Sequence, residues 1–174
     1  MLTGDIELTE LEYPIHTHCY ELEPDSACPG RWRGGFGGRY AIEPVGHATA
    51  LSSIGEGVEI APPSLVGAKS DFNNDRIYRR WIQRSDNKRE ELVSHRLVAL
   101  APGDIYHSFP PGGGGIGDAF ERDLDSVRLD VENELISRER AETEYGVVFI
   151  GNSLEIDTRA TIKLRSSGRS GEKQ

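Results

Sequence analysis

The stretch PPGGGGIGDAFERD, residues 110–123, decides how the last third of the chain folds. Four consecutive glycines follow a proline pair, and Asp123 stands immediately before an apolar pattern with helical spacing. Glycine permits tight turns and close approach of other backbone, whereas aspartate is a favoured helix N-cap. The stretch therefore predicts a closely packed turn that leads into a helix.

The same stretch matches the spacing G-x-G-x-x-G through Gly112, Gly114 and Gly117. A dinucleotide loop needs a strand directly before it and a crossover helix after it, and the other common phosphate loop ends in Lys followed by Ser or Thr. Here Pro110 and Pro111 come first, Asp118 follows, and no alternation of strands and helices surrounds the turn. Because an aspartate would repel phosphate, the sequence argues against nucleotide binding by this turn.

Helical signals follow the glycine turn. An apolar face recurs at Leu124, Val127, Val131 and Leu135, and a second short helix is expected over residues 138–145, ended by Gly146. VVFI, residues 147–150, predicts a last strand. The next segment, residues 154–164, is compatible with a strand or a helix, and residues 166–174 are expected to form a disordered polar tail.

The first two thirds of the chain predict β-structure. Short β-favouring runs separated by turn residues occupy residues 14–22, 38–45 and 47–54, and a hairpin is expected from residues 76–83 and 92–100. The fold class is therefore mainly β (α+β): a barrel-like or two-sheet β domain, then a short helix pair and a final strand. We expect one domain over residues 1–165.

Composition limits the expected partners and cellular compartment of the protein. The net charge of −9 disfavours nucleic acid as a partner, and no apolar run is long enough to predict a membrane span. The acidic N-terminal segment is unlike a signal peptide, and the chain has only two cysteines. These features together predict a cytoplasmic protein.

A metal site is one alternative. His16 and His18 share a strand face and Glu23 follows, a spacing similar to the first metal motif of the cupin barrels. PGDIYH, ending at His107, could supply the last ligand, although its spacing is one residue too long. Histidine pairs on strands are often ordinary polar surface residues, so the sequence leaves a cupin-like metal-binding barrel open as an alternative.

Two arginines flank Trp32. In an extended segment Arg31 and Arg33 project to one side, where their guanidinium groups could grip a carboxylate or pair with a partner chain. The competing interpretation is a pair of structural salt bridges. No Ser/His/Asp arrangement and no activated cysteine can be recognised, so the catalytic residues stay unknown.

Three blocks together resemble the C-terminal part of the hydantoinase B/oxoprolinase family, which includes N-methylhydantoinase B, 5-oxoprolinase and related ketone carboxylase subunits. They are YELEPDSACPGRWRGGFGG (residues 20–38), PPGGGGIGDAFERDLDSVRLDVENELIS (residues 110–137) and YGVVF (residues 145–149). A weaker block, APPSLVGAKSDFN (residues 61–73), has Ser64 and Ala68 where the family usually has glycine, and Ala119 replaces a usual proline. The resemblance covers residues 13–149.

The resemblance implies a portion of an enzyme subunit that is not active alone. Members of the family act with an actin-like ATPase, the hydantoinase A-like subunit, and use ATP to open cyclic amides such as hydantoin or 5-oxoproline, or to carboxylate ketones. Full members are several times longer. The resemblance therefore implies no cofactor in this chain, with ATP and a divalent metal held by the partner or by an N-terminal hydantoinase B-like portion.

The candidates for contact with a substrate or a subunit interface are Arg31, Arg33, Gly112, Gly113, Gly114, Gly115 and Asp118. No metal site of the family transfers to His16 or His18. A non-catalytic assembly module of such a complex is the alternative with the same fold.

Overall fold

A computed structural model describes residues 5–55, 59–60, 62–67, 77–92 and 96–170. The chain forms two compact units, each built from three segments of sequence. The first comprises Met1–Leu22, Gly38–Ala61 and Ile77–Pro111, and the second comprises Glu23–Gly37, Pro62–Arg76 and Gly112–Gln174. Two units need not be two domains, so one domain over residues 1–165 stays a prediction.

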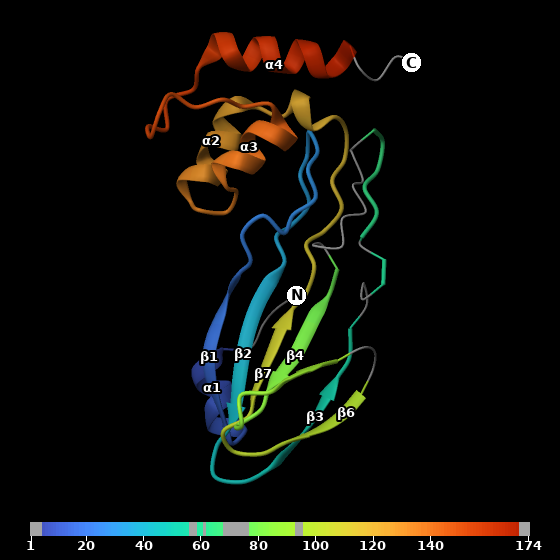
Figure 1. Cartoon of the computed structure of the whole chain (residues 1–174), viewed down its shortest axis with the longest axis vertical. Coiled ribbons are helices and arrows are strands. Elements are labelled where there is room, and N and C mark those ends of the chain that lie inside the picture. Colours follow the sequence, from blue (N-terminus) through green and yellow to red (C-terminus); the bar gives the residue numbers. More distant parts are fainter. Residues whose placement is uncertain (1–4, 56–58, 61, 68–76, 93–95, 171–174) are drawn as a thin grey trace. The chain divides into compact units, whose positions relative to one another are not determined.

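The first unit contains two antiparallel sheets and helix α1, Ile6–Glu12. The larger sheet has the order β1-β2-β7-β4-β5, and β3 and β6 form the smaller one (Figure 1). The strands are β1 Ile15–Leu22, β2 Gly38–Pro44, β3 Thr49–Ser53, β4 Arg79–Gln83, β5 Arg89–Glu91, β6 Arg96–Leu100 and β7 Ile105–Phe109. The two-sheet form of the predicted β fold is thus confirmed, and the barrel-like form is wrong because the sheets do not close.

The core of this unit lies on one face of the larger sheet. Ile82 and Tyr106 are cross-strand partners at 0% and 1% exposure, and they cluster with Leu92 and Leu100. Side chains alternate between faces along a strand, so these residues point to one face, where Leu51 and Val98 of the smaller sheet pack against them.

The predicted hairpin is partly wrong. Strand β4 pairs with β5, through Trp81↔Glu91 and Gln83↔Arg89, rather than with the apolar run at residues 96–100. That run forms β6, whose partner is β3. The polar segment Arg89–Glu91 forms the second hairpin strand because it follows the turn directly, although its side chains carry no apolar signal.

The second unit contains η2, Ala119–Glu121, and helices α2 Leu124–Glu132, α3 Arg138–Tyr145 and α4 Thr158–Ser170 (Figure 1). The predicted helix pair is confirmed. Asp123 accepts a hydrogen bond from the Ser126 N–H, which caps α2, and Gly146 ends α3 with φ 62°, a left-handed conformation that suits glycine. The core is formed by Ala119, Val127, Ile136, Ala141, Tyr145 and Val147.

Two expectations for the C-terminal segment are corrected. Val147 is buried in the helical core and Phe149 forms an isolated bridge with Ile156, so residues 147–150 belong to neither sheet. Helix α4 extends to Ser170, so the predicted polar tail is helical over residues 166–170, and residues 171–174 lie outside the described part. Among the described residues, no helix has the length and apolar character that crossing a bilayer requires.

Candidate functional site

The glycine turn lies in the second unit, where three segments meet. We call this meeting point the glycine junction and define it as residues 28–35, 62–65 and 112–117. Trp32 and Ile116 exchange both backbone hydrogen bonds, at 3.0 and 2.9 Å. The Leu65 N–H donates to the Gly115 carbonyl at 2.8 Å, and the Gly113 N–H donates to the Gly35 carbonyl at 2.8 Å. The blocks that carry the family resemblance are therefore interwoven through their backbones.

Close approach explains why these positions are glycine. A Cβ atom at Gly34 would lie 1.9 Å from the Gly113 carbonyl oxygen, and one at Gly114 would lie 2.0 Å from the Pro63 carbonyl oxygen. These neighbours are backbone atoms, which cannot swing aside as a side chain can. The glycines therefore permit a backbone packing that no larger residue would allow.

The junction does not fit a phosphate group. The N–H groups of Gly113, Gly115, Ile116 and Gly117 donate to acceptors within the unit: the Gly35 carbonyl, the Ser64 hydroxyl, the Trp32 carbonyl and the Leu65 carbonyl. A phosphate loop needs such N–H groups directed at the ligand. Asp118 caps η2 by accepting from the Phe120 N–H at 2.8 Å. The structure therefore agrees with the argument against nucleotide binding here.

Arg33 belongs to a partly buried charge network. Its Nε and Nη2 donate to the two carboxylate oxygens of Asp130 at 2.9 and 3.0 Å, and Arg122 Nη2 donates to the same carboxylate at 2.9 Å. The Asp130 side chain is 9% exposed, and the Arg33 guanidinium lies 4.2 Å from the centre of the Phe36 ring. This bidentate pairing matches the structural interpretation of Arg33.

Arg31 has a different environment. Its side chain is 57% exposed, and Nη1 lies 3.7 Å from the Glu121 carboxylate. It lines a pocket of about 510 Å³ within the second unit, together with Phe120, Glu121, Ile162, Arg165 and Ser166. The two arginines were expected to act together, but their environments differ. Arg33 pairs with Asp130, whereas Arg31 lines a solvent-accessible pocket.

Apolar side chains gather at the outer side of the glycine junction. Trp32, Leu65 and Ile116 are joined by backbone bridges and are 67%, 56% and 45% exposed, and the neighbouring Val66 is 82% exposed. We call these four residues the junction patch. Exposed apolar side chains on adjacent backbone segments are typical of a contact surface. Val66 also has φ 51°, which a β-branched residue rarely adopts.

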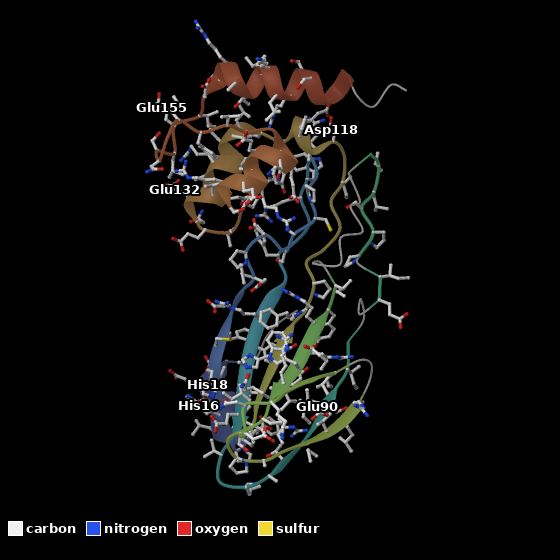
Figure 2. The ribbon with its side chains drawn as sticks, viewed as in Figure 1. His16, His18, Glu90, Asp118, Glu132 and Glu155 are labelled. Atoms are coloured by element: carbon white, nitrogen blue, oxygen red, sulfur yellow. The ribbon has the colours of Figure 1, made fainter. Side chains whose placement is uncertain are left out.

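The three histidines of the cupin-like alternative all lie in the first unit, where the ring centres of His16 and His18 are 4.9 Å apart. His16 and His18 project from β1 (Figure 2) and contact Glu10 at 3.5 Å and Glu43 at 2.9 Å. His107 stacks on Trp81, and burial, followed by the charges of His18 and Arg89, lowers the pKa of His107.

Glu23 belongs to the second unit, whereas the three histidines belong to the first. The described ranges contain no group of three or more His, Cys, Asp or Glu side chains that could hold a metal ion. His16 and His18 each contact a carboxylate, and the described residues therefore give the metal-binding alternative no support.

Sequence reasoning missed Asp130, the residue on which the network of Arg33 and Arg122 depends. The helical spacing could have indicated that Asp130 is buried, since position 130 lies three residues after Val127 and next to Val131. Val127 is buried and Val131 is partly buried. An acidic residue on the buried side of a helix needs a cationic partner.

Comparison with known proteins supports the resemblance. The model of the family described as hydantoinase B/oxoprolinase matches residues 1–119. The chain is 37% identical over 167 residues to caprolactamase subunit beta from Pseudomonas jessenii, covering 96% of this chain and 29% of that protein.

Two solved structures have the same fold. The crystal structure of ATP-dependent caprolactamase from Pseudomonas jessenii matches with a TM-score of 0.76 and 34% identity, over 95% of this chain and 28% of that one. A nucleotide-free structure of acetone carboxylase matches with a TM-score of 0.66 and 20% identity, over 97% of this chain and 26% of that one, which shows the fold alone. The chain spans less than a third of the length of these proteins. It belongs to the hydantoinase B/oxoprolinase family.

Proposed function

We propose that this chain is a portion of a subunit that takes part in the ATP-dependent opening of cyclic amides. The observation that carries the proposal is its 37% identity, over 96% of its length, to caprolactamase subunit beta. An amide in a ring is unreactive toward water, and phosphorylation of its oxygen by ATP would make it a better electrophile. Ketone carboxylation has less support, because the acetone carboxylase match is only 20% identical.

In this proposal, ATP and a divalent metal are held by a hydantoinase A-like ATPase subunit or by an N-terminal hydantoinase B-like portion. Two observations support that division. The N–H groups of Gly113, Gly115, Ile116 and Gly117 already donate within the unit, and the described ranges contain no metal-ligand cluster. Within the part of the chain that the structure describes, the residues therefore do not fit either group.

The contribution of this chain is that of a rigid portion that binds the rest of the subunit. Trp32 and Leu65 of the junction patch are held by backbone hydrogen bonds to the glycine turn, so their side chains are presented on a fixed framework. Exposed aromatic residues on a rigid framework are typical binding hot spots. The alternative of a non-catalytic assembly module keeps this interface and omits only a direct role in turnover, which Arg31 and its pocket would provide.

Trp32→Ser is expected to weaken binding to the N-terminal hydantoinase B-like portion by at least about tenfold, because loss of a hot-spot tryptophan removes a large buried apolar area. The measurement is isothermal titration of that portion with the chain. Leu97→Ser is the matched control, since Leu97 is 76% exposed but lies on β6 in the first unit. If both variants bound with the same affinity as the wild type, the junction patch would not be part of the interface.

The proposed activity is tested with the complete complex of this chain, the N-terminal portion and the ATPase subunit. Caprolactam, hydantoin and 5-oxoproline are supplied with ATP, with a non-hydrolysable ATP analogue, and with no nucleotide. We expect ring opening only with ATP, accompanied by ADP formation. Ring opening that proceeds equally without ATP, or carboxylation of acetone with no cyclic amide opened, would contradict the proposal.

A further inference from the structure

The pocket of about 510 Å³ in the second unit has a wall that is partly charged and partly apolar. Three segments far apart in the sequence form it, and they contribute Arg31, then Phe120 and Glu121 of η2, then Ile162, Arg165 and Ser166 of α4. The three residues of α4 share one helix face because they are spaced i, i+3 and i+4. The volume lies in the range of about 300–1,000 Å³ that is usual for small-molecule sites.

Arg165 is held at the pocket by contacts within the second unit. Its Nε donates to the Tyr145 carbonyl at 3.0 Å. Helix α4 is fixed in turn by Thr161, which is 1% exposed and whose hydroxyl accepts from the Val148 N–H at 3.1 Å. The guanidinium of Arg165 is therefore presented by an anchored helix.

Arg31 reaches the pocket from the glycine junction. Its N–H donates to the Gly117 carbonyl at 3.2 Å, which fixes the backbone from which the side chain extends. Its Nη1 lies 3.7 Å from the Glu121 carboxylate, which is longer than a hydrogen bond, and the two side chains are 57% and 45% exposed. Such a loose, solvent-screened ion pair is weak, so Arg31 can turn toward a ligand at little cost.

The charges and the apolar surface of the pocket limit the kind of ligand. Two arginines and one glutamate give the wall a net charge of about +1, which a single negative charge would neutralise. A dianionic phosphate would leave an excess negative charge beside Glu121. Phe120 and Ile162 add apolar surface, and the Ile162 side chain is 63% exposed, so a hydrocarbon that covers it gains from burial.

We propose that this pocket binds a small aliphatic carboxylate. The planar guanidinium groups of Arg31 and Arg165 match the oxygens of a carboxylate, while Phe120 and Ile162 contact its hydrocarbon chain. Hydrolysis of the C–N bond of a lactam produces this class of molecule, since water supplies OH to the carbonyl carbon and H to the nitrogen. The ring-opened product as the occupant rests on the proposed function, whereas binding of a carboxylate does not.

The test is an NMR titration of the full 174-residue chain without ATP or partner subunits. The probes are sodium hexanoate, 6-aminohexanoate and neutral hexanamide at constant ionic strength. We expect saturable shifts of pocket amides with both carboxylates and at least about tenfold weaker binding of hexanamide, which lacks the charge. Arg31→Met should weaken hexanoate binding about tenfold, and Glu121→Gln should strengthen it about threefold because it removes a repelling charge.

Lys163→Met is the matched control. Lys163 is an exposed cation on α4 that does not line the pocket, so its removal changes the net charge of the chain as Arg31→Met does. We expect this variant to change the affinity for hexanoate by less than about twofold.

The opposite results are defined for each comparison. Equal affinities of the wild type for hexanoate and hexanamide, or no saturable binding of hexanoate, would overturn the proposal without any variant. Equal effects of Arg31→Met and Lys163→Met would overturn it as well, and binding of hexanoate but not of 6-aminohexanoate would exclude the ring-opened product as the occupant. If the complex opened no lactam while hexanoate still bound as expected, the proposed function would fail and the carboxylate pocket would stand.

Discussion

Gly114→Ala is expected to destabilise the second unit by about 4 kcal/mol or more, at the upper end of single-substitution effects. The added methyl would lie 2.0 Å from the Pro63 carbonyl oxygen and 2.8 Å from the carbonyl carbon of the same residue. Both are backbone atoms within the glycine junction, so relief of the clash requires the strand-like segments to separate. A loss of this size is comparable with the whole stability of many domains.

Gly35→Ala is the matched control. It lies in the same junction, its φ is not positive, and a Cβ atom there would meet nothing within 4 Å. We expect a change within about 0.5 kcal/mol. Urea unfolding followed by tryptophan fluorescence measures both variants in a Trp81→Phe background, where Trp32 is the single tryptophan and reports on the junction. A Gly114→Ala variant as stable as Gly35→Ala would show that the junction is not closely packed.

Asp130→Asn is expected to cost about 3–5 kcal/mol, the range for breaking a buried ion pair. Asparagine keeps the shape of the side chain but removes the charge, which leaves Arg33 and Arg122 without their shared counter-ion. The Arg122 side chain is only 11% exposed, so solvent cannot replace the lost carboxylate. The free energy of unfolding from urea titration measures the effect.

The control for this network is Asp125→Asn on the same helix. Asp125 pairs with Arg128 at 3.3 Å, but its side chain is 79% exposed, and such surface pairs contribute at most about 1 kcal/mol. If both variants lost the same free energy, the network of Arg33, Asp130 and Arg122 would not stabilise the unit, and Arg33 would return as a candidate for ligand contact.

Local signals explain which elements the sequence predicts correctly. Helices α2 and α3 are capped by Asp123 and Ser137, whose side chains accept hydrogen bonds from the N–H groups of Ser126 and Arg140, and Gly146 is the C-cap of α3. These interactions lie within a few residues of each other, so short sequence patterns encode them. Helix α4 has the same kind of local signal, since Asp157 accepts from the Ala160 N–H at 2.9 Å.

Long-range pairing explains the errors. Strand β6 pairs with β3 because both supply apolar side chains to the core around Ile82 and Tyr106, and this choice depends on packing rather than on the turn before β5. The segment Val147–Ile150 is rich in β-favouring residues, yet burial of Val147 between helices decides its structure.

The candidate site was predictable only in part. The glycine run and the Arg-Trp-Arg segment identify the blocks that meet at the junction, but their contact depends on backbone approach between residues about 80 positions apart, which no local pattern encodes. The separation of Arg31 from Arg33 depends on Asp130, a residue of a distant helix. The pairing of Arg33 with Asp130 can therefore be identified only from the folded structure.

In the proposed function, this chain is a required portion of a larger ATP-dependent cyclic amide hydrolase. The most direct measurement is the rate of ATP-dependent caprolactam opening by the complex prepared without the chain and then supplied with it. We expect activity to be lost on omission, restored by the wild-type chain and by Gly35→Ala, and not restored by Gly114→Ala. Full activity in the absence of the chain would contradict the claim.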